Sequence, residues 1–283
     1  MTATDDYYDL ALQHQIDSRA YQAALVAQLL RLLEQSDKDL VRKLRDGLPN
    51  LGPDFSEKGT QWRSLLKEVR ETRAAILKQA AETVQAEMPQ LAEVQAEAEL
   101  GAIQTAIGID LNFVRVPVEQ LHAAAIAVPF ASGPNAANSL MGWFKRLSDV
   151  DQGRVEDAIR LGVIQGETIN QIVQRLIGTR AKRFEDGVLS VTRRNAEAIA
   201  RTGVNAVTNM AREMVWDANS DISSGILWVS TLDGRTSAIC RARDGHAAPL
   251  GSHPQPQGFP PLVPKSARPP AHVNCRSTTV LLF

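Results

Sequence analysis

The chain has 283 residues, and its 31 Lys and Arg nearly balance its 32 Asp and Glu to give a net charge of -1. This length is enough for one large domain or two to three smaller ones, and the balance argues against a protein that grips nucleic acid mainly by bulk charge. We expect no membrane span and no classical secretion, because the sequence lacks both an apolar run of about 18 residues and a basic-then-apolar leader. Two cysteines are too few for a disulfide scaffold.

Residues 1–108 are predicted to form a helical arm. Leucines recur at helical spacing between residues 25 and 48, and the Gly- and Pro-rich segment 47–53 is expected to end this helix. A second helix is predicted from about Trp62, with Pro89 expected to break or kink it. The many Ala, Gln and Glu residues favour long helices.

Residues 109–220 are predicted to form a helical middle region. Apolar and polar residues alternate over 109–118, which indicates a short strand, and small residues, Pro and Gly over 123–139 indicate an irregular surface segment. Thr168 and Gln171 have the spacing of a capping box, so a helix is expected to begin there.

A long helix is predicted over 188–217, and it carries a polar stripe besides its apolar face. The stripe consists of Arg201, Thr202, Asn205, Asn209 and Arg212. Two interpretations are open: a solvated face, or a face that hydrogen-bonds another part of the chain. The second predicts that Thr202, Asn205 or Arg201 bonds the backbone near 233–236 or 274–276, which would otherwise be buried without partners.

Residues 221–283 form a tail of distinct composition, with eight of the fourteen prolines, both cysteines and a net charge of +3. β-branched and aromatic residues predict a strand at 226–230, and a second strand is predicted at 278–283. Because a single strand is not stable alone, we expect the two to pair antiparallel. The fold class predicted is α+β and mainly α-helical: a long N-terminal helical arm, a helical middle and a small Pro-rich subdomain containing the strands.

The same pairing would bring Cys240 near Cys275. Together with His272 these residues offer two thiolates and an imidazole, the ligands that zinc takes, and His246 or His253 is a candidate fourth ligand. Zinc would cross-link a tail too small to build its own core. The alternative is two buried free thiols beside polar turn histidines.

An ordered series of short motifs resembles the Mu F-like phage head-morphogenesis family. The motifs are Leu140–Trp143 with Leu147, Ile159–Gly162 with Gly166, Ile199–Thr202, Trp228–Thr236, Cys240, Asp244–Gly245 and Pro270–Arg276. The resemblance covers roughly residues 112–283. It implies a minor head protein of a tailed bacteriophage, made in the host cytoplasm and present in few copies in the virion head near the portal. The portal protein and the major capsid protein are the partners it implies.

The chain departs from the family pattern at three positions. The family commonly has a second cysteine in each of two pairs, and Ser237 and Ser277 stand at those positions here. A four-cysteine metal site is therefore excluded. Gly203 replaces an acidic residue that often follows the Arg-Thr pair. A disulfide between Cys240 and Cys275 is disfavoured, because phage heads assemble in a reducing cytoplasm.

We expect no enzymatic activity. The sequence has no phosphate-binding loop, no nucleophile elbow and no His-Glu-x-x-His motif. The family has been linked by fold to ADP-ribosyltransferases, but no glutamate follows Glu213 to serve that chemistry. A metal-dependent nuclease using His253, His272 and Asn274 is the other enzyme alternative, and it lacks the usual acidic partner.

The basic tail gives a third interpretation, non-specific contact with the phosphates of packaged double-stranded DNA. The candidate residues are Arg235, Arg241, Arg243, Lys265, Arg268 and Arg276. An ordinary solvated surface explains the same residues.

Overall fold

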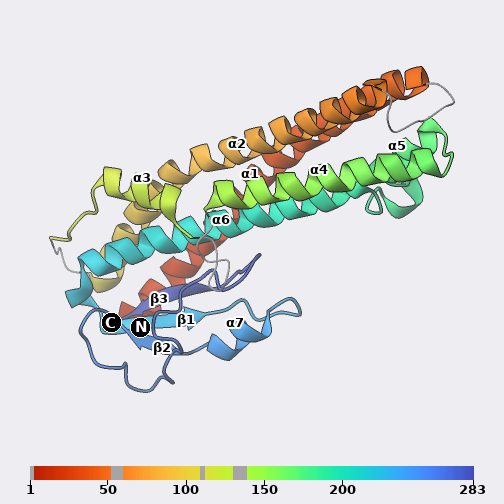
Figure 1. Cartoon of the computed structure of the whole chain (residues 1–283). Coiled ribbons are helices and arrows are strands. Elements are labelled where there is room, and N and C mark those ends of the chain that lie inside the picture. The colour runs from red at the N-terminus through yellow and green to blue at the C-terminus, as the bar shows by residue number, and fades with distance from the viewer. Residues whose placement is uncertain (1–2, 52–59, 109–111, 130–138) are drawn as a thin grey trace. The chain divides into compact units, whose positions relative to one another are not determined.

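A computed structural model of the chain describes residues 3–51, 60–108, 112–129 and 139–283. It is mainly helical with one small antiparallel sheet in the C-terminal tail, which confirms the predicted α+β class (Figure 1). In the ranges described, no helix has the length and apolar character that crossing a membrane requires.

The elements follow one another along the chain as helices first and strands last. The α-helices are α1 (Ala3–Gly47), α2 (Thr60–Ile107), α3 (Val118–Ala127), α4 (Leu140–Ile164), α5 (Ile169–Ile177), α6 (Val188–Ala218) and α7 (Ala238–Arg243). The strands are β1 (Gly225–Val229), β2 (Ala247–Pro249) and β3 (Thr278–Leu282). Short 3-10 helices cover Leu48–Leu51, Arg180–Lys182 and Ser220–Ile222.

The chain divides into two compact units, each assembled from segments that are far apart in sequence. Unit 1 contains Met1–Ala24, Gln85–Leu140 and Ala200–Phe283, and unit 2 contains Leu25–Val84 and Met141–Ile199. The helices α1, α2 and α6 therefore each supply residues to both units.

This division follows spatial contacts, whereas the three regions predicted above (1–108, 109–220 and 221–283) follow composition. The two divisions describe different properties of the chain, and the predicted region boundaries stay predictions.

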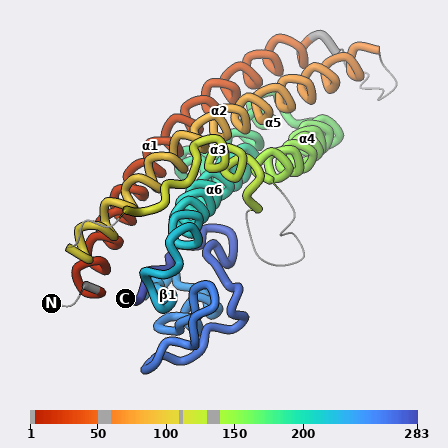
Figure 2. Tube along the Cα trace, turned by 90° about the vertical axis from the view of Figure 1, so that its left-hand side faces the viewer, coloured from red at the N-terminus to blue at the C-terminus, as the bar shows by residue number. Residues whose placement is uncertain are grey.

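Unit 2 is built from helices, and parts of α1, α2, α4 and α6 run side by side in it with α5 (Figure 2). Its buried apolar side chains come from all five helices. They include Leu40, Leu44, Trp62, Leu65, Val69, Val155, Ile159, Ile172, Leu176 and Leu189. The predicted capping box begins α5, since Thr168 Oγ1 accepts from the backbone N–H of Gln171 and the Gln171 side chain accepts from that of Thr168.

A buried charge network crosses the core of unit 2. Arg73 is 1% exposed; its Nη1 donates to Asp37 at 2.7 Å and its Nε donates to Asp151 at 2.7 Å. Asp37 also accepts from Arg193, and Asp151 accepts from the hydroxyl of Thr192. Burial raises the pKa of Asp37, and the positive charge of Arg73 opposes that shift. The network joins α1, α2, α4 and α6 through one guanidinium group.

The three-stranded sheet of unit 1 has the order β2-β1-β3, with both pairings antiparallel. Ile226 lies opposite Leu281 and Trp228 opposite Thr279. This register confirms the predicted pairing of the strand near 226–230 with the last strand. Strand β2 was not predicted, because it is only three residues long.

A second buried ion pair connects the sheet of unit 1 to the helices beside it. Arg212 on α6 donates from Nε to Glu99 on α2 at 2.7 Å, and its Nη1 donates to Thr278 on β3 at 2.7 Å. Glu99 also accepts from Trp216 at 2.6 Å and from the hydroxyl of Tyr7 on α1. Burial alone would lower the pKa of Arg212, but the charges and hydrogen bonds of Glu99 and Tyr7 together raise it.

The strand predicted over 109–118 is wrong for the residues described. Residues 112–117 have no regular structure, and residues 109–111 lie outside the described ranges. The Asn219 side chain supplies the backbone hydrogen bonds that a neighbouring strand would supply. Its Oδ1 accepts from Val114 N at 2.7 Å and its Nδ2 donates to Val114 O at 2.9 Å. A single amide thus satisfies an extended backbone without a second strand.

Two other predictions need correction. Of the two outcomes expected at Pro89, a break is contradicted, because α2 is continuous over Thr60–Ile107, and a kink stays a prediction. The helix packs on both sides of the proline through buried Met88, Leu91 and Ala92, and this packing outweighs the lost backbone hydrogen bond. The segment predicted to be irregular over 123–139 is helical up to Ala127, and residues 130–138 are not among those described.

Arg73→Ala should lower the free energy of unfolding by about 3–5 kcal/mol, since it leaves Asp37 and Asp151 buried without their counter-charge. Arg70→Ala is the matched control on the same helix. The Arg70 side chain is 51% exposed, so its loss should cost less than about 1 kcal/mol. Chemical denaturation of both variants measures the difference, and equal losses would contradict the interpretation.

Candidate functional site

The two cysteines and one histidine of the tail meet in a single cluster. Cys240 Sγ lies 3.1 Å from His272 Nε2 and 3.7 Å from Cys275 Sγ. One ligand atom from each of the three residues lies within 4.8 Å of the others, and no further group of this kind occurs in the ranges described. The cluster that the sequence predicted from residue type is thus assembled by the fold, across a chain separation of 35 residues.

A short helix and a tight turn position the three side chains. Ser237 caps α7, its hydroxyl accepting from the backbone N–H of Cys240 at 3.3 Å, and this places Cys240 in the first turn. On the other side, Cys275 N donates to His272 O at 3.1 Å, which closes a turn with Asn274 in the left-handed conformation at φ 60°. This turn brings His272 and Cys275 to the same side of the loop.

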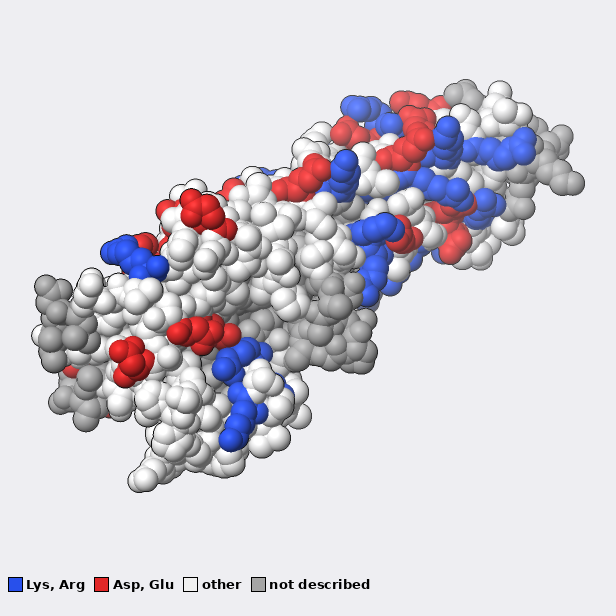
Figure 3. All heavy atoms as spheres, turned by 60° about the vertical axis from the view of Figure 1, so that its left-hand side comes forward, with Lys and Arg blue, Asp and Glu red and all other residues white. Residues whose placement is uncertain are grey.

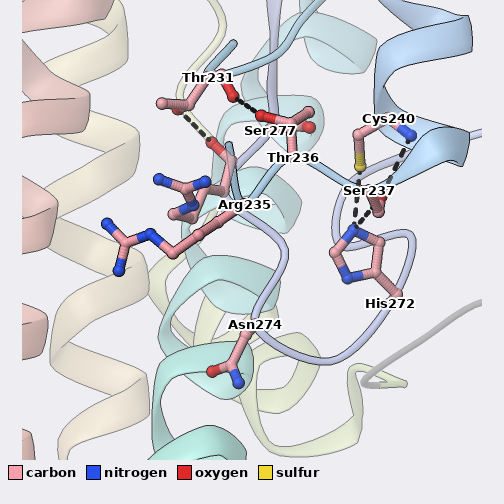
Figure 4. Close-up of a pocket in the computed structure, with 9 residues that line it drawn as sticks. Thr231, Arg235, Thr236, Ser237, Cys240, His272, Asn274 and Ser277 are labelled. Carbon is pink, nitrogen blue, oxygen red and sulfur yellow. Dashed lines mark hydrogen bonds between the residues drawn. The ribbon is translucent and has the colours of Figure 1, made fainter. Parts of the chain in front are cut away.

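The orientation of the imidazole ring is fixed from its far side. His272 Nδ1 lies 2.8 Å from the carbonyl oxygen of Val273, and a carbonyl can only accept, so Nδ1 carries the proton. Nε2 then presents its lone pair to the Cys240 sulfur and to the Ser237 hydroxyl at 2.7 Å (Figure 4). Metal-bound histidines are oriented by the same kind of bond.

The serines that replace family cysteines lie beside this cluster. Ser237 contacts His272, and Ser277 hydrogen-bonds Ser230 with 3.1 Å between their hydroxyl oxygens. Ser230 in turn donates to the Cys240 carbonyl at 2.9 Å. All four positions of the family's cysteine pattern therefore converge, although only two carry sulfur here.

The two thiol groups lie close enough to hydrogen-bond each other. This contact lowers the pKa of Cys240 and, together with burial, raises the pKa of Cys275. Cys240 is therefore the more acidic thiol of the pair. A thiolate is the form that binds metal ions or attacks electrophiles.

The polar stripe of α6 holds the turn that carries His272 and Cys275. Thr202 Oγ1 accepts from Asn274 N at 2.9 Å, and Asn205 Nδ2 donates to Cys275 O at 2.8 Å and to Ser277 O at 3.5 Å. These bonds confirm the predicted contact between the stripe and the backbone at 274–276. Most of the stripe is buried, Thr202 at 0% and Asn205 at 4% exposed.

A contribution from α1 to the same turn was not predicted. Arg19 Nη2 donates to Thr231 Oγ1 at 2.6 Å and to Arg276 O at 3.2 Å. Nothing in the local sequence around Arg19 distinguishes it from an ordinary basic residue on the exposed face of a helix. The contact spans 257 residues in the chain, so only the three-dimensional fold reveals it.

The six basic residues proposed for DNA contact divide into two sets. Arg276 makes a bidentate ion pair with Asp233, Arg268 pairs with Glu213, and Arg243 stacks on Trp228 at 5.2 Å. The exposed set is Arg235, Arg241 and Lys265. Figure 3 shows Lys and Arg side chains in a short stripe on the tail, whereas charges of both signs interleave along the helices.

The other candidate ligands lie elsewhere. His246 Nδ1 is 3.1 Å from Asp244 O, and His253 Nε2 is 3.0 Å from Ser220 O. Neither belongs to the cluster of Cys240, His272 and Cys275. The nuclease set of His253, His272 and Asn274 is thus divided between different surroundings.

A small pocket opens beside the Cys–His cluster. Its lining includes Ser237, Cys240 and His272 on one side, and Thr236 and Asn274 elsewhere on its wall (Figure 4). The pocket has room for about one water molecule beside Cys240 and His272, and both cysteines are buried.

Part of the chain matches a known protein family. Residues 153–280 match the family described as Phage Mu protein F like protein. No curated protein and no solved structure matches the chain significantly. The match extends from within α4 to within β3 and includes the whole Cys–His cluster.

The class to which this segment is similar is a family of bacteriophage proteins. Residues 153–280 form a Mu F-like region, which confirms the resemblance stated from the sequence.

Asn205→Ala should lower the free energy of unfolding by about 1–3 kcal/mol, because the carbonyls of Cys275 and Ser277 lose their donor in a buried place. Asn195→Ala, at an exposed position of α6, is the matched control and should change it by less than about 0.5 kcal/mol. Thermal and urea denaturation test the pair. A neutral Asn205→Ala would show that the tail does not need this bond.

Glu213 gives the tail a pH dependence. Burial raises the pKa of Glu213 from its ordinary 4.5 to about 7, although Arg268 Nε lies 3.2 Å from its Oε1. A carboxyl with a raised folded-state pKa stabilises the fold fully below its unfolded pKa, and that contribution is lost as pH rises through about 7.

Glu213→Gln stays neutral, so its free energy of unfolding relative to the unmodified chain should rise as pH increases from about 4.5 to 7. Since the Glu213 side chain is 24% exposed, we expect a gain on the order of 1–2 kcal/mol. Denaturation at several pH values measures it, with Asp149→Asn on α4 as an exposed control. A flat difference across this range would refute the assignment.

Proposed function

We propose that this protein is a structural minor head protein of a tailed bacteriophage that acts in head assembly at or near the portal. The observation that carries the proposal is the Mu F-like match over residues 153–280. Its site is consistent with a structural role, because the Cys–His cluster and the polar stripe of α6 both fix the tail in place.

The helices α1 and α2 are the part proposed to contact other head proteins. Both lie outside residues 153–280, and at 45 and 48 residues they are the longest elements described. Their exposed side chains form ion pairs such as Lys43–Glu68 and Lys78–Glu82. Surfaces of this mixed charge suit a polar, specific contact with the portal or major capsid protein.

Contact with packaged DNA is a further part of the proposal, and it involves only some of the six basic candidates. Arg235, Arg241 and Lys265 have exposed side chains that phosphates could reach, although Arg235 and Arg241 also contact Asp233. The other three basic candidates are less exposed and bond Asp233, Glu213 or Trp228. Such contacts would be independent of DNA sequence and would weaken steeply with salt.

An enzymatic role is the alternative. The Cys240 thiolate beside His272 has the composition of a nucleophile and its base, and a pocket adjoins it. The proposal of a non-enzymatic role therefore requires a direct test.

Deleting the gene from the phage should reduce the yield of filled heads, and the protein should co-sediment with purified heads. Heads that lack the portal should contain less of it than complete heads do, if the portal is its site. Quantitative gel analysis of both particles measures the copy number. Equal amounts in both would place the protein elsewhere in the head.

The purified protein should show no NAD hydrolysis and no plasmid nicking with added divalent metals. Robust activity in either assay that His272→Ala abolishes, with the fold intact by circular dichroism, would replace the structural proposal by an enzymatic one. His14→Ala, on α1 and outside the candidate nuclease set, is the matched control for the nicking assay.

A further inference from the structure

We propose that Cys240, His272 and Cys275 bind one zinc ion with three protein ligands, and that the fourth position faces the adjoining pocket and holds water. This goes beyond the proposed role in the head, since it concerns how the tail itself is built.

Two of the three distances between the ligand atoms are close to those of a tetrahedral zinc site, and all three lie within 4.8 Å. With Zn–S near 2.3 Å and Zn–N near 2.0–2.1 Å, tetrahedral angles require about 3.8 Å between two sulfurs and about 3.5 Å between sulfur and nitrogen. The observed distances are 3.7 Å from Cys240 Sγ to Cys275 Sγ and 3.1 Å from Cys240 Sγ to His272 Nε2. Shifts of a few tenths of an ångström complete the site.

The surroundings prepare the ligands for a metal. His272 keeps its proton on Nδ1 through the Val273 carbonyl, so the lone pair of Nε2 is directed toward the Cys240 sulfur. Asn205 fixes the carbonyl of Cys275, and the Ser237 cap fixes the backbone of Cys240. Each ligand thus has a neighbour that restricts its movement.

A disulfide explains the geometry less well. A sulfur–sulfur bond is about 2.05 Å long, so the two sulfurs would have to approach from 3.7 Å. A disulfide would also give the His272 imidazole no role, whereas a zinc ion would accept the lone pair of its Nε2. The imidazole of His272 is therefore the feature that favours a metal site over a simple pair of cysteines.

The residues beside the cluster indicate that no protein atom fills the fourth coordination position of the zinc ion. Ser237 Oγ lies 2.7 Å from His272 Nε2, but a serine hydroxyl is not among the usual zinc ligands. The pocket reaches the cluster on this side. Three protein ligands with one position left for water are a known arrangement for zinc.

The test uses the full chain, purified without added metal and then measured for metal content by plasma mass spectrometry. We expect one zinc per chain. Replacement by cobalt should give the absorption bands of a tetrahedral thiolate site. His272→Ala and Cys275→Ala should each weaken zinc binding by at least about 100-fold, whereas His246→Ala and His253→Ala should not change it.

Ser237→Cys keeps the proposal testable even if the ligand variants fail to fold. A thiolate at this position should enter the fourth site, tighten zinc binding and strengthen the thiolate bands of the cobalt form. Absence of stoichiometric zinc, equal affinity in the His272 and His253 variants, unchanged affinity in Ser237→Cys, or a Cys240–Cys275 disulfide found by mass spectrometry would each overturn the proposal.

Discussion

The C-terminal tail depends on the buried polar face of α6 for its backbone hydrogen bonds. The tail contains little regular structure: α7 has six residues and β2 has three. Thr202 and Asn205 satisfy the turn at Asn274–Cys275, and Arg212 reaches Thr278 on β3. Because an unsatisfied buried backbone group costs about as much as several apolar contacts supply, the tail is stable only where α6 provides these partners.

The need of the tail for hydrogen-bond partners explains why α6 carries several buried polar residues. Asn209 donates to Asn205 Oδ1 at 2.6 Å, which leaves the Asn205 amide nitrogen free to serve the tail. Its own Oδ1 accepts from Thr278 at 3.1 Å. The stripe is therefore a connected network in which each member orients the next, and such a network specifies one position of the tail on the helix.

The sequence was sufficient for features that depend on local periodicity or on chemically distinctive residues. The helix that became α6, the cap at Thr168 and the pairing of the two main strands have signals of this kind. The Cys–His cluster was predicted because cysteine and histidine are rare in this chain, with two and five copies.

Features that depend on one distant side chain could not be predicted. Val114 looked like part of a strand, but Asn219, 105 residues away, satisfies its backbone. Arg19 reaches the tail from α1, and nothing in its neighbourhood in sequence indicates this. A proline such as Pro89 is expected to interrupt a helix, but α2 continues through it because of its tertiary packing. In each case the deciding partner is remote, so the pattern around the residue carries no information about it.

Several bonds besides the Cys–His cluster hold the tail, and this bears on the serines at 237 and 277. Asp233 pairs with Arg276 through both carboxylate oxygens, at 2.7 Å and 2.5 Å, and Arg19 bonds the Arg276 carbonyl. The hydrogen bond from Arg276 lowers the pKa of Asp233, so this pair persists through the neutral range.

With these contacts and the α6 stripe in place, the fold of the tail does not rest on four thiolates. Ser237 and Ser277 then serve as hydrogen-bonding partners in positions where the family pattern has sulfur. These hydrogen bonds preserve the turn that presents His272 and Cys275 beside the pocket.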